Sequence, residues 1–427
     1  MVAVKLKDLA MDKVVDLLIA EQIRLPSITP DNSEFSNLLY KSLRQKTILT
    51  PFLLEEFQKL TITQVELMSC MFDAMDILLL KTQPVRKLAV NDIDQTTGGG
   101  KYFDERKQTI DMYTLLGDTL RNCHRLTHLD LRGVQHQWLV DWMRKIGENL
   151  LNMQYLAVTH QNLRASDVFL LVRRFPNLTY LDISCSSVES LRGIAELHRL
   201  KTLILFNTPL PKRTEFYQRE QSFKLYQLEH LDLSVSSHEQ NMSNIIGAIL
   251  PSLVSLDCYN TKFSERQLVK VLGQHRFLKK MGLLGTDAIN HPIVDLLEKM
   301  TIPTVSTGLT LLEQFIEERR PYVVFLVELR MISIIEEKFV EQDKDELRGL
   351  VKLACKVFKT FNYEHCTQFA ALQCLDILTK DNRVSILLKR EKAMIVNTLF
   401  PCHPKYQPTF TAIKWRILNQ LNENVNV

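Results

Sequence analysis

The stretch Leu126-Thr-His-Leu129-Asp-Leu131 carries a phrase that recurs along the chain: apolar, two residues, apolar, one residue, apolar. Clear copies begin at Leu178, Leu200 and Leu228. The looser copies are Ile62-Val65-Leu67, Val85-Leu88-Val90, Met153-Leu156-Val158, Leu253-Leu256-Cys258 and Leu278-Met281-Leu283. From Leu126 onward the copies start 27, 25, 22, 28, 25 and 25 residues apart. This spacing lies in or near the range of about 20–29 residues that is typical of leucine-rich repeats.

Each copy predicts a short strand whose apolar positions point into a solenoid, followed by a segment that returns the chain as a helix. Residues 167–175 and 263–272 carry apolar residues at helical spacing and are the clearest return helices. Because one unit cannot bury its apolar face alone, neighbouring units must stack. We therefore expect an α/β leucine-rich-repeat solenoid over residues 61–302.

The position after each strand, which is often Asn in such repeats, is polar here but varied. It holds Gln161, Ser186, Thr208, Ser236 and Thr261. These side chains can hydrogen-bond a turn, but they form no regular Asn ladder. The pattern is typical of irregular, intracellular repeats.

Composition is ordinary for a globular protein of this length. The 427 residues are 45% hydrophobic and 24% charged, with a net charge of +4, so bulk charge indicates neither nucleic acid nor a membrane surface as a partner. The eight cysteines form no C-x-x-C pair, which fits a reducing compartment. With no secretory hydrophobic core at the N-terminus, we expect a cytoplasmic and/or nuclear protein.

Helical patterns flank the repeats on both sides. Residues 1–60 hold an amphipathic helix over 4–20, a second from Ser33 and a third over 51–60, which we expect to cap the solenoid. Residues 303–427 have only helical periodicity, which predicts an all-α, armadillo-like segment.

Between two repeats, the polar stretch 91–107 contains Gly98-Gly99-Gly100 and predicts an insertion loop. A phosphate-binding loop is the disfavoured alternative, because Tyr102 stands where Ser or Thr is needed and Gln95 where the first Gly is needed.

The sequence holds no constellation that supports catalysis, so we expect a non-catalytic protein with no cofactor and no metal. Residues that face the concave side of the solenoid are candidates for substrate binding. They are His128, Tyr155, Tyr180, Phe206, His230 and Tyr259, with an acidic column of Asp130, Asp182, Asp232 and Asp257. Aromatic residues on a rigid concave sheet suit protein recognition. The alternative is that these residues simply fill an exposed sheet.

The order of helix, irregular repeats and helical segment resembles the Zyg-eleven/Zer family. The resemblance includes the run from LEHLDLS at 228–234 through LVSLDCYNTKFS at 253–264 to LKKMGLLGT at 278–286. It continues in FIEERRPYVVFLVELR at 315–330, which looks like the family's entry into its armadillo repeats. Members of this family are substrate receptors of cullin-two ubiquitin ligases. The resemblance thus implies elongin B/C, the cullin-two complex and a protein substrate as partners, with no nucleic acid and no membrane.

In this family the N-terminal helix is an elongin-C-binding box. The matching residues here are Leu6, Leu9, Ala10 and Val14, with Ala10 in place of the family's Cys. Spacing of i, i+4, i+8 places Leu6, Ala10 and Val14 on one stripe, as helix-in-groove binding requires. The same helix could instead only cap the first repeat, in a repeat scaffold outside any ligase. The family's pocket for N-terminal glycine degrons lies in later armadillo repeats, so no degron-binding residue is assigned.

Overall fold

The computed structural model describes residues 2–26, 33–67, 70, 72–90, 102–104, 109–120, 123–132, 134, 137–138, 142–143, 150–191, 193–209, 225–235, 250–283, 285–288, 298–299, 304–317, 320–361, 365–400 and 408–423. The chain divides into two compact units, Met1–Lys299 and Met300–Val427. The division falls three residues before the expected start of the helical segment. The N-terminal helices share a unit, and a continuous apolar core, with the repeats.

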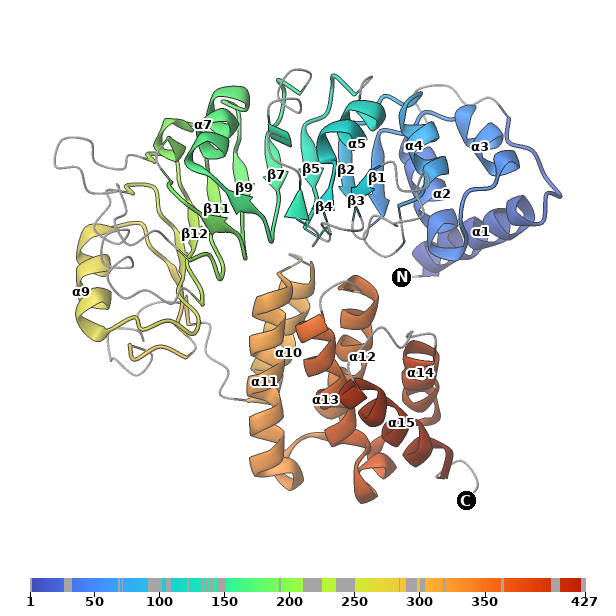
Figure 1. The fold of residues 1–427 in the computed structure, drawn as a ribbon. Helices are drawn as coiled ribbons and strands as arrows, with labels where there is room; N and C mark the ends of the chain where they lie inside the picture. Colours follow the sequence, from blue (N-terminus) through green and yellow to red (C-terminus); the bar gives the residue numbers. More distant parts are fainter. Residues whose placement is uncertain are drawn as a thin grey trace. The chain divides into compact units, whose positions relative to one another are not determined.

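Among the described residues of the first unit, ten strands form one parallel sheet in the order β1-β2-β5-β7-β9-β11-β12-β13-β14-β15 (Figure 1). The strands are β1 Gln64–Leu67, β2 Lys87–Val90, β5 His128–Asp130, β7 Tyr155–Ala157, β9 Tyr180–Asp182, β11 Thr202–Ile204, β12 His230–Asp232, β13 Ser255–Asp257, β14 Lys280–Gly282 and β15 Glu298–Lys299. Each of the nine predicted repeat phrases supplies one of the first nine strands. The predicted leucine-rich-repeat solenoid is confirmed, and β15 adds a strand that the pattern does not predict.

The repeat phrase sets the register of the sheet. Leu88, Leu129, Leu156, Leu181 and Leu203 pair in turn across neighbouring strands, and the series continues through Leu231, Leu256 and Met281. All eight side chains are at most 3% exposed. Since residues alternate between the two faces of a strand, the residues on either side of each leucine must point to the other face.

The return segments differ from repeat to repeat. Helix α7 (Ala165–Arg174) follows β7 and helix α9 (Glu265–Gln274) follows β13, as predicted. After β9, however, the chain returns through a 3₁₀ turn, Ile194–Glu196, and not through an α-helix. This unit is the shortest, with 22 residues between repeat starts, and leaves no room for a longer helix.

The N-terminal helices close one end of the sheet. They are α1 (Val2–Ile19), α2 (Ser33–Lys46) and α3 (Pro51–Gln58), whose N-cap Thr50 accepts a hydrogen bond from the Leu53 amide. Lys46 joins α2 to α1, because its Nζ lies 3.1 Å from Asp12 Oδ1 and 2.9 Å from Asp16 Oδ1. Helix α4 (Ala74–Leu80) follows β1 and packs against α3.

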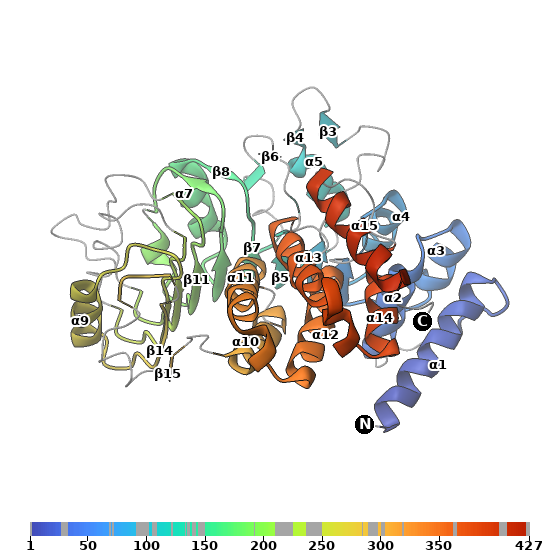
Figure 2. The same ribbon diagram turned by 90° about the horizontal axis from the view of Figure 1, so that it is seen from below.

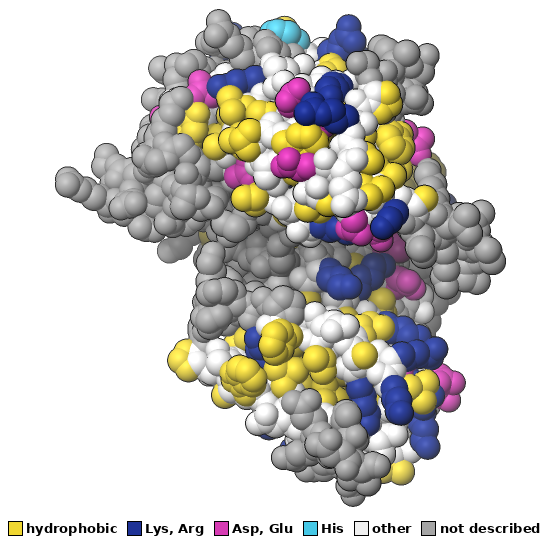
Figure 3. Space-filling model, turned by 90° about the vertical axis from the view of Figure 1, so that its right-hand side faces the viewer, with side chains coloured by type: hydrophobic (Ala, Val, Ile, Leu, Met, Phe, Trp, Pro, Cys, Tyr) yellow, Lys and Arg dark blue, Asp and Glu magenta, His cyan; other side chains and the backbone are white. Residues whose placement is uncertain are grey.

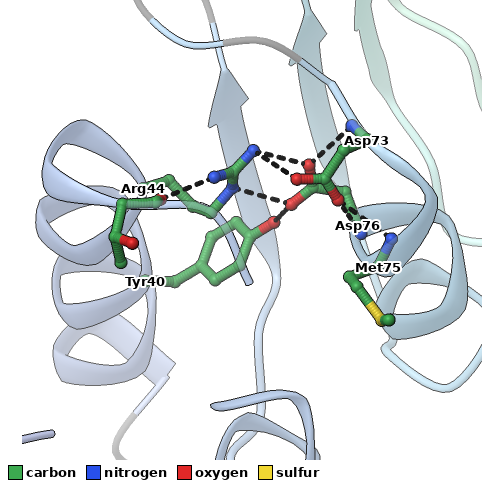
Figure 4. A network of polar contacts seen from close by, with 6 residues as sticks. Tyr40, Arg44, Asp73, Met75 and Asp76 are labelled. Atoms are coloured by element: carbon green, nitrogen blue, oxygen red, sulfur yellow. Dashed lines mark hydrogen bonds and ion pairs between the residues drawn. The ribbon is translucent and has the colours of Figure 1, made fainter. Parts of the chain in front are cut away.

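A buried polar network joins α2 to the start of α4 (Figure 4). Arg44 donates from Nε to Asp76 Oδ1 at 2.9 Å and from Nη2 to Asp76 Oδ2 at 2.8 Å. Tyr40 donates its hydroxyl proton to the same carboxyl group. Asp73 and Asp76 form a reciprocal capping box at the N-terminus of α4. The network therefore fixes the cap on the first repeat with directional contacts.

The expected insertion loop, residues 91–107, lies mostly outside the described residues. At its end, β3 (Phe103–Asp104) pairs antiparallel with β4 (Thr109–Ile110), which pairs with β6 (Gln137–Trp138). Tyr102 is buried and donates to Asp118 Oδ2 at 2.7 Å. This tyrosine thus joins the start of the small sheet to α5 (Met112–Thr119).

The described secondary-structure elements of the second unit are all helices, as predicted. Its helices are α10 (Val305–Glu317), α11 (Pro321–Lys338), α12 (Lys344–Thr360), α13 (His365–Thr379), α14 (Lys389–Leu399) and α15 (Pro408–Glu423). Figure 2 shows these helices packed side by side. Helix α13 contacts α11, α12 and α15, so it forms the centre of this unit.

Candidate functional site

The candidate site is a row of side chains that the sheet register brings together on its non-core face. The row takes the first strand position of eight consecutive strands, β2 to β14. Its members are Lys87, His128, Tyr155, Tyr180, Thr202, His230, Ser255 and Lys280. Lys87 is exposed and the other seven are half-buried, so the row is accessible along its length within this unit. We call it the central row.

Three rings of the central row stack on one another. The His128 and Tyr155 ring centroids are 5.6 Å apart with planes 16° from parallel, and those of Tyr155 and Tyr180 are 4.1 Å apart at 12°. Neighbouring strands lie about 4.8 Å apart, so residues in register are held at stacking distance by the backbone itself. We call these three residues the aromatic stack.

A buried ion pair lies beside the aromatic stack. Arg132 Nη2 is 2.7 Å from Asp130 Oδ2, and both residues are at most 7% exposed. Burial raises the pKa of Tyr155 and Tyr180, so both phenols stay protonated and can donate hydrogen bonds. Burial, and then the nearby charge of Lys87, lowers the pKa of His128, so its imidazole is neutral at physiological pH.

Two of the predicted surface residues do not belong to the central row. Phe206 and Tyr259 lie four positions after Thr202 and Ser255, beyond their strands, and are only 5% and 2% exposed. The Tyr259 ring lies against Gly282, where an added Cβ would come within 2.4 Å of Tyr259 Cζ. The prediction that these two residues face a partner is wrong, because the chain turns inward after each strand and buries this position.

The predicted acidic column is also buried. Asp130, Asp182 and Asp232 each accept a hydrogen bond from the backbone amide two residues later, at 3.2, 3.0 and 2.9 Å. An Asp side chain that bonds its own backbone two residues on stabilises a turn. These carboxylates therefore shape the turn after each strand. Asp257, the fourth member, is fully buried and lies 3.5 Å from His230 Nε2.

The N-terminal helix presents part of the predicted elongin-binding stripe. Ala10 is exposed, whereas Val14 is half-buried and packs against the core beside the fully buried Val15 and Leu18. The side chains of Leu6 and Leu9 lie outside the described residues. Hydrophobic side chains are visible at this end of the first unit, in the upper part of Figure 3. Those that are more than a third exposed are Ile19, Phe35, Leu38 and Ile48.

The described residues hold neither a cluster of metal-ligand side chains nor a candidate membrane span. No three or more His, Cys, Asp or Glu side chains there converge as metal ligands. No helix within those ranges is long and apolar enough to cross a membrane.

Comparison with known proteins places the repeats in context. Residues 169–275 match the family described as Zer-1-like leucine-rich repeats. Over 240 residues the chain is 28% identical to gastrulation-defective protein 3 of Caenorhabditis elegans, an alignment that spans 53% of this chain and 32% of that protein. The chain thus covers about a third of this relative's length. The resemblance to the Zyg-eleven/Zer family is confirmed over the leucine-rich repeats.

Two similar solved structures have lower sequence identity to the chain than this relative does. An internalin from Listeria monocytogenes is 16% identical with a TM-score of 0.33, covering 60% of this chain and 69% of its own. The Arabidopsis receptor kinase HAESA is 15% identical with a TM-score of 0.31, covering 53% and 34%. The strand register, and not these likenesses, defines the solenoid described above.

Proposed function

From the resemblance to the Zyg-eleven/Zer family, we propose that this protein is the substrate-recognition adaptor of a cullin-RING ubiquitin ligase. In this proposal α1 docks on elongin C within a cullin-two complex, and the solenoid holds a protein substrate. The protein itself is non-catalytic. The observation that carries the proposal is a match to Zer-1-like leucine-rich repeats, preceded in the chain by helix α1, whose predicted stripe includes the exposed Ala10.

The burial pattern of α1 supports docking through that stripe. Val15 and Leu18 fix one side of the helix to the core, while Ala10, on the predicted stripe, remains exposed. A helix that binds in a groove needs apolar side chains at i, i+4 and i+8 that are not already buried in the core of its own domain. Leu6 would be the deepest anchor, and Ala10 would allow close approach of the partner helix.

The test is co-purification of the full chain with elongin B/C, comparing the parent with Leu6→Asp. We expect the parent to bind and Leu6→Asp to lose most of the bound elongin, because a buried apolar anchor becomes a charge. The matched control is Val269→Asp on α9, an exposed apolar residue outside α1. A parent protein that captures no elongin B/C would refute the docking proposal.

A leucine-rich-repeat scaffold without a ligase role is the second candidate function. It is favoured by the packing of Val14, which shows that the predicted stripe partly serves the core. In that case Leu6→Asp lowers the melting temperature and changes no elongin contact. Measuring thermal unfolding alongside co-purification therefore separates an anchor from a cap.

A further inference from the structure

The central row, which contains Lys87 and Lys280, lies beside a second row of residues that also carries a net positive charge. The residue one position before each member of the central row forms the preceding row, joined by backbone hydrogen bonds such as Thr127 N to Arg86 O at 2.9 Å and Lys279 N to Val254 O at 2.8 Å. Its members are Arg86, Thr127, Gln154, Thr179, Lys201, Glu229, Val254 and Lys279.

The two rows together are strongly basic. They hold five Lys or Arg residues, Arg86, Lys87, Lys201, Lys279 and Lys280, and one acidic residue, Glu229. Glu229 Oε1 is 2.7 Å from Lys201 Nζ, so this carboxylate is already neutralised. Of the buried carboxylates beneath the rows, Asp130 pairs with Arg132, and Asp257 Oδ2 lies 3.5 Å from His230 Nε2. The central row and the strand-entry edge formed by the preceding row together favour an anionic ligand.

The aromatic stack strengthens this preference through its geometry. Because the rings of His128, Tyr155 and Tyr180 lie face to face, the stack leaves ring edges, not ring faces, along its sides. The Tyr155 and Tyr180 hydroxyls are buried and hydrogen-bond to each other beside Arg132. Ring edges carry the positive part of the aromatic quadrupole, which suits carboxylate oxygens.

The same geometry argues against single-stranded nucleic acid. Such ligands bind by stacking bases on open aromatic faces. Here Tyr155 has both faces covered by its neighbours, and His128 and Tyr180 each have one face covered. A polypeptide with acidic side chains needs no open ring face.

We propose that the central and preceding rows bind an extended acidic peptide segment of the protein substrate, with its carboxylates directed at Arg86, Lys87 and the edge of the aromatic stack. This deepens the proposed function, on which it rests for the role of the bound partner. From Lys87 to Tyr180 the row crosses three strand spacings, about 14 Å, which about four extended residues cover. A short acidic motif is therefore enough to span the site.

The experiment uses the immobilised full chain and three pools of random peptides of about twelve residues, a length that more than covers the site. The pools are matched in Leu, Pro and Ser and differ in carrying Asp/Glu, Asn/Gln or Lys/Arg. We expect about fivefold or greater retention of the acidic pool over the neutral pool, decreasing with salt. The double variant R86E/K87E should abolish that preference.

The control is R266E/K270E, which makes the same charge change at two exposed positions of α9 and should keep the acidic preference within about twofold. Equal retention of the three pools, equal loss in both double variants, or displacement of the acidic pool by an oligouridylate competitor would overturn the proposal. Elongin B/C capture is measured on the same protein. If the protein binds acidic peptides but not elongin B/C, the ligase role is refuted and the peptide-binding site is supported. If it binds elongin B/C without preferring acidic peptides, the peptide-binding site is refuted and the ligase role is supported.

Discussion

At the scale of single residues, one backbone position in each repeat decides how the chain leaves its strand. Six described residues at equivalent positions, five residues after the start of the strand, have left-handed backbone conformation. They are His160, Cys185, Asn207, Val235, Asn260 and Gly285, with φ between 46° and 75°. This conformation turns the chain inward. Where the next residue is described, it is buried, and the hydroxyls of Thr208, Thr261 and Thr286 donate to backbone carbonyls there. The polar residues Thr208, Thr261 and Thr286 thus provide hydrogen bonds that stabilise the turns after their strands.

Val235 is the least suited of these six residues to its conformation. A β-branched side chain at φ 60° is strained, whereas Asn adopts the left-handed region readily. We expect Val235→Asn to stabilise the protein by about 1 kcal/mol. The reciprocal change Asn260→Val should destabilise it by a similar amount. Urea unfolding of both variants checks this, and a loss of stability in Val235→Asn would contradict it.

At the scale of elements, the second unit holds an acidic group in its apolar interior. Glu328 of α11 is fully buried, and neither carboxyl oxygen has a hydrogen-bond partner among the described residues. Nearby Cys374 on α13 is also buried. Burial raises the pKa of Glu328 well above its usual value, so the folded chain keeps the carboxyl group protonated. Helices α11 and α13 therefore pack around a neutral carboxylic acid, and its effect on the free energy of unfolding depends on pH.

The sign of that dependence follows from proton linkage. Between the unfolded pKa, about 4.5, and the raised folded pKa, the folded state binds one proton more than the unfolded state. The stabilising contribution is complete below the unfolded pKa. As pH rises above it, the free energy of unfolding falls by about 1.4 kcal/mol per pH unit until the folded pKa is reached.

We expect Glu328→Met to remove this pH dependence and to stabilise the protein at neutral pH, because Met fills a similar volume without an ionisable group. The matched control is Glu336→Met on the same helix, where the side chain is exposed and the slope should not change. Denaturant unfolding from pH 4.5 to pH 7.5 measures both. An unchanged slope in Glu328→Met would show that this carboxyl group ionises in the folded state.

At the scale of the whole molecule, the first unit is a one-dimensional stack. Each strand of the sheet pairs only with the strand before and the strand after it, so stability is set by contacts between adjacent repeats. The α2–α4 network and the buried face of α1 hold the first repeat in place. Damage to one repeat should therefore weaken its neighbours before distant strands.

Leu156→Ala tests this picture in the middle of the stack. Leu156 is fully buried and in register with Leu129 and Leu181, so its truncation should cost about 3 kcal/mol. We expect hydrogen exchange to accelerate most in β5, β7 and β9, and least in β1 and β14. Uniform acceleration along the whole sheet would mean that the repeats unfold as one cooperative block.

The repeat phrase by itself determined the strands, their parallel order and the stack, because apolar side chains at fixed spacing have only one way to reach a common core. It also placed His128, Tyr155, Tyr180 and His230 on one row, while the helical spacing of apolar residues predicted α1, α2, α3, α7 and α9. Only the tertiary structure decided which of the predicted surface residues are buried. Phe206, Tyr259 and the Asp column are buried because the chain turns inward after the strand and packs against the next repeat. The contacts of Arg44 with Asp76 and the isolation of Glu328 likewise depend on segments far apart in sequence, where local periodicity carries no information.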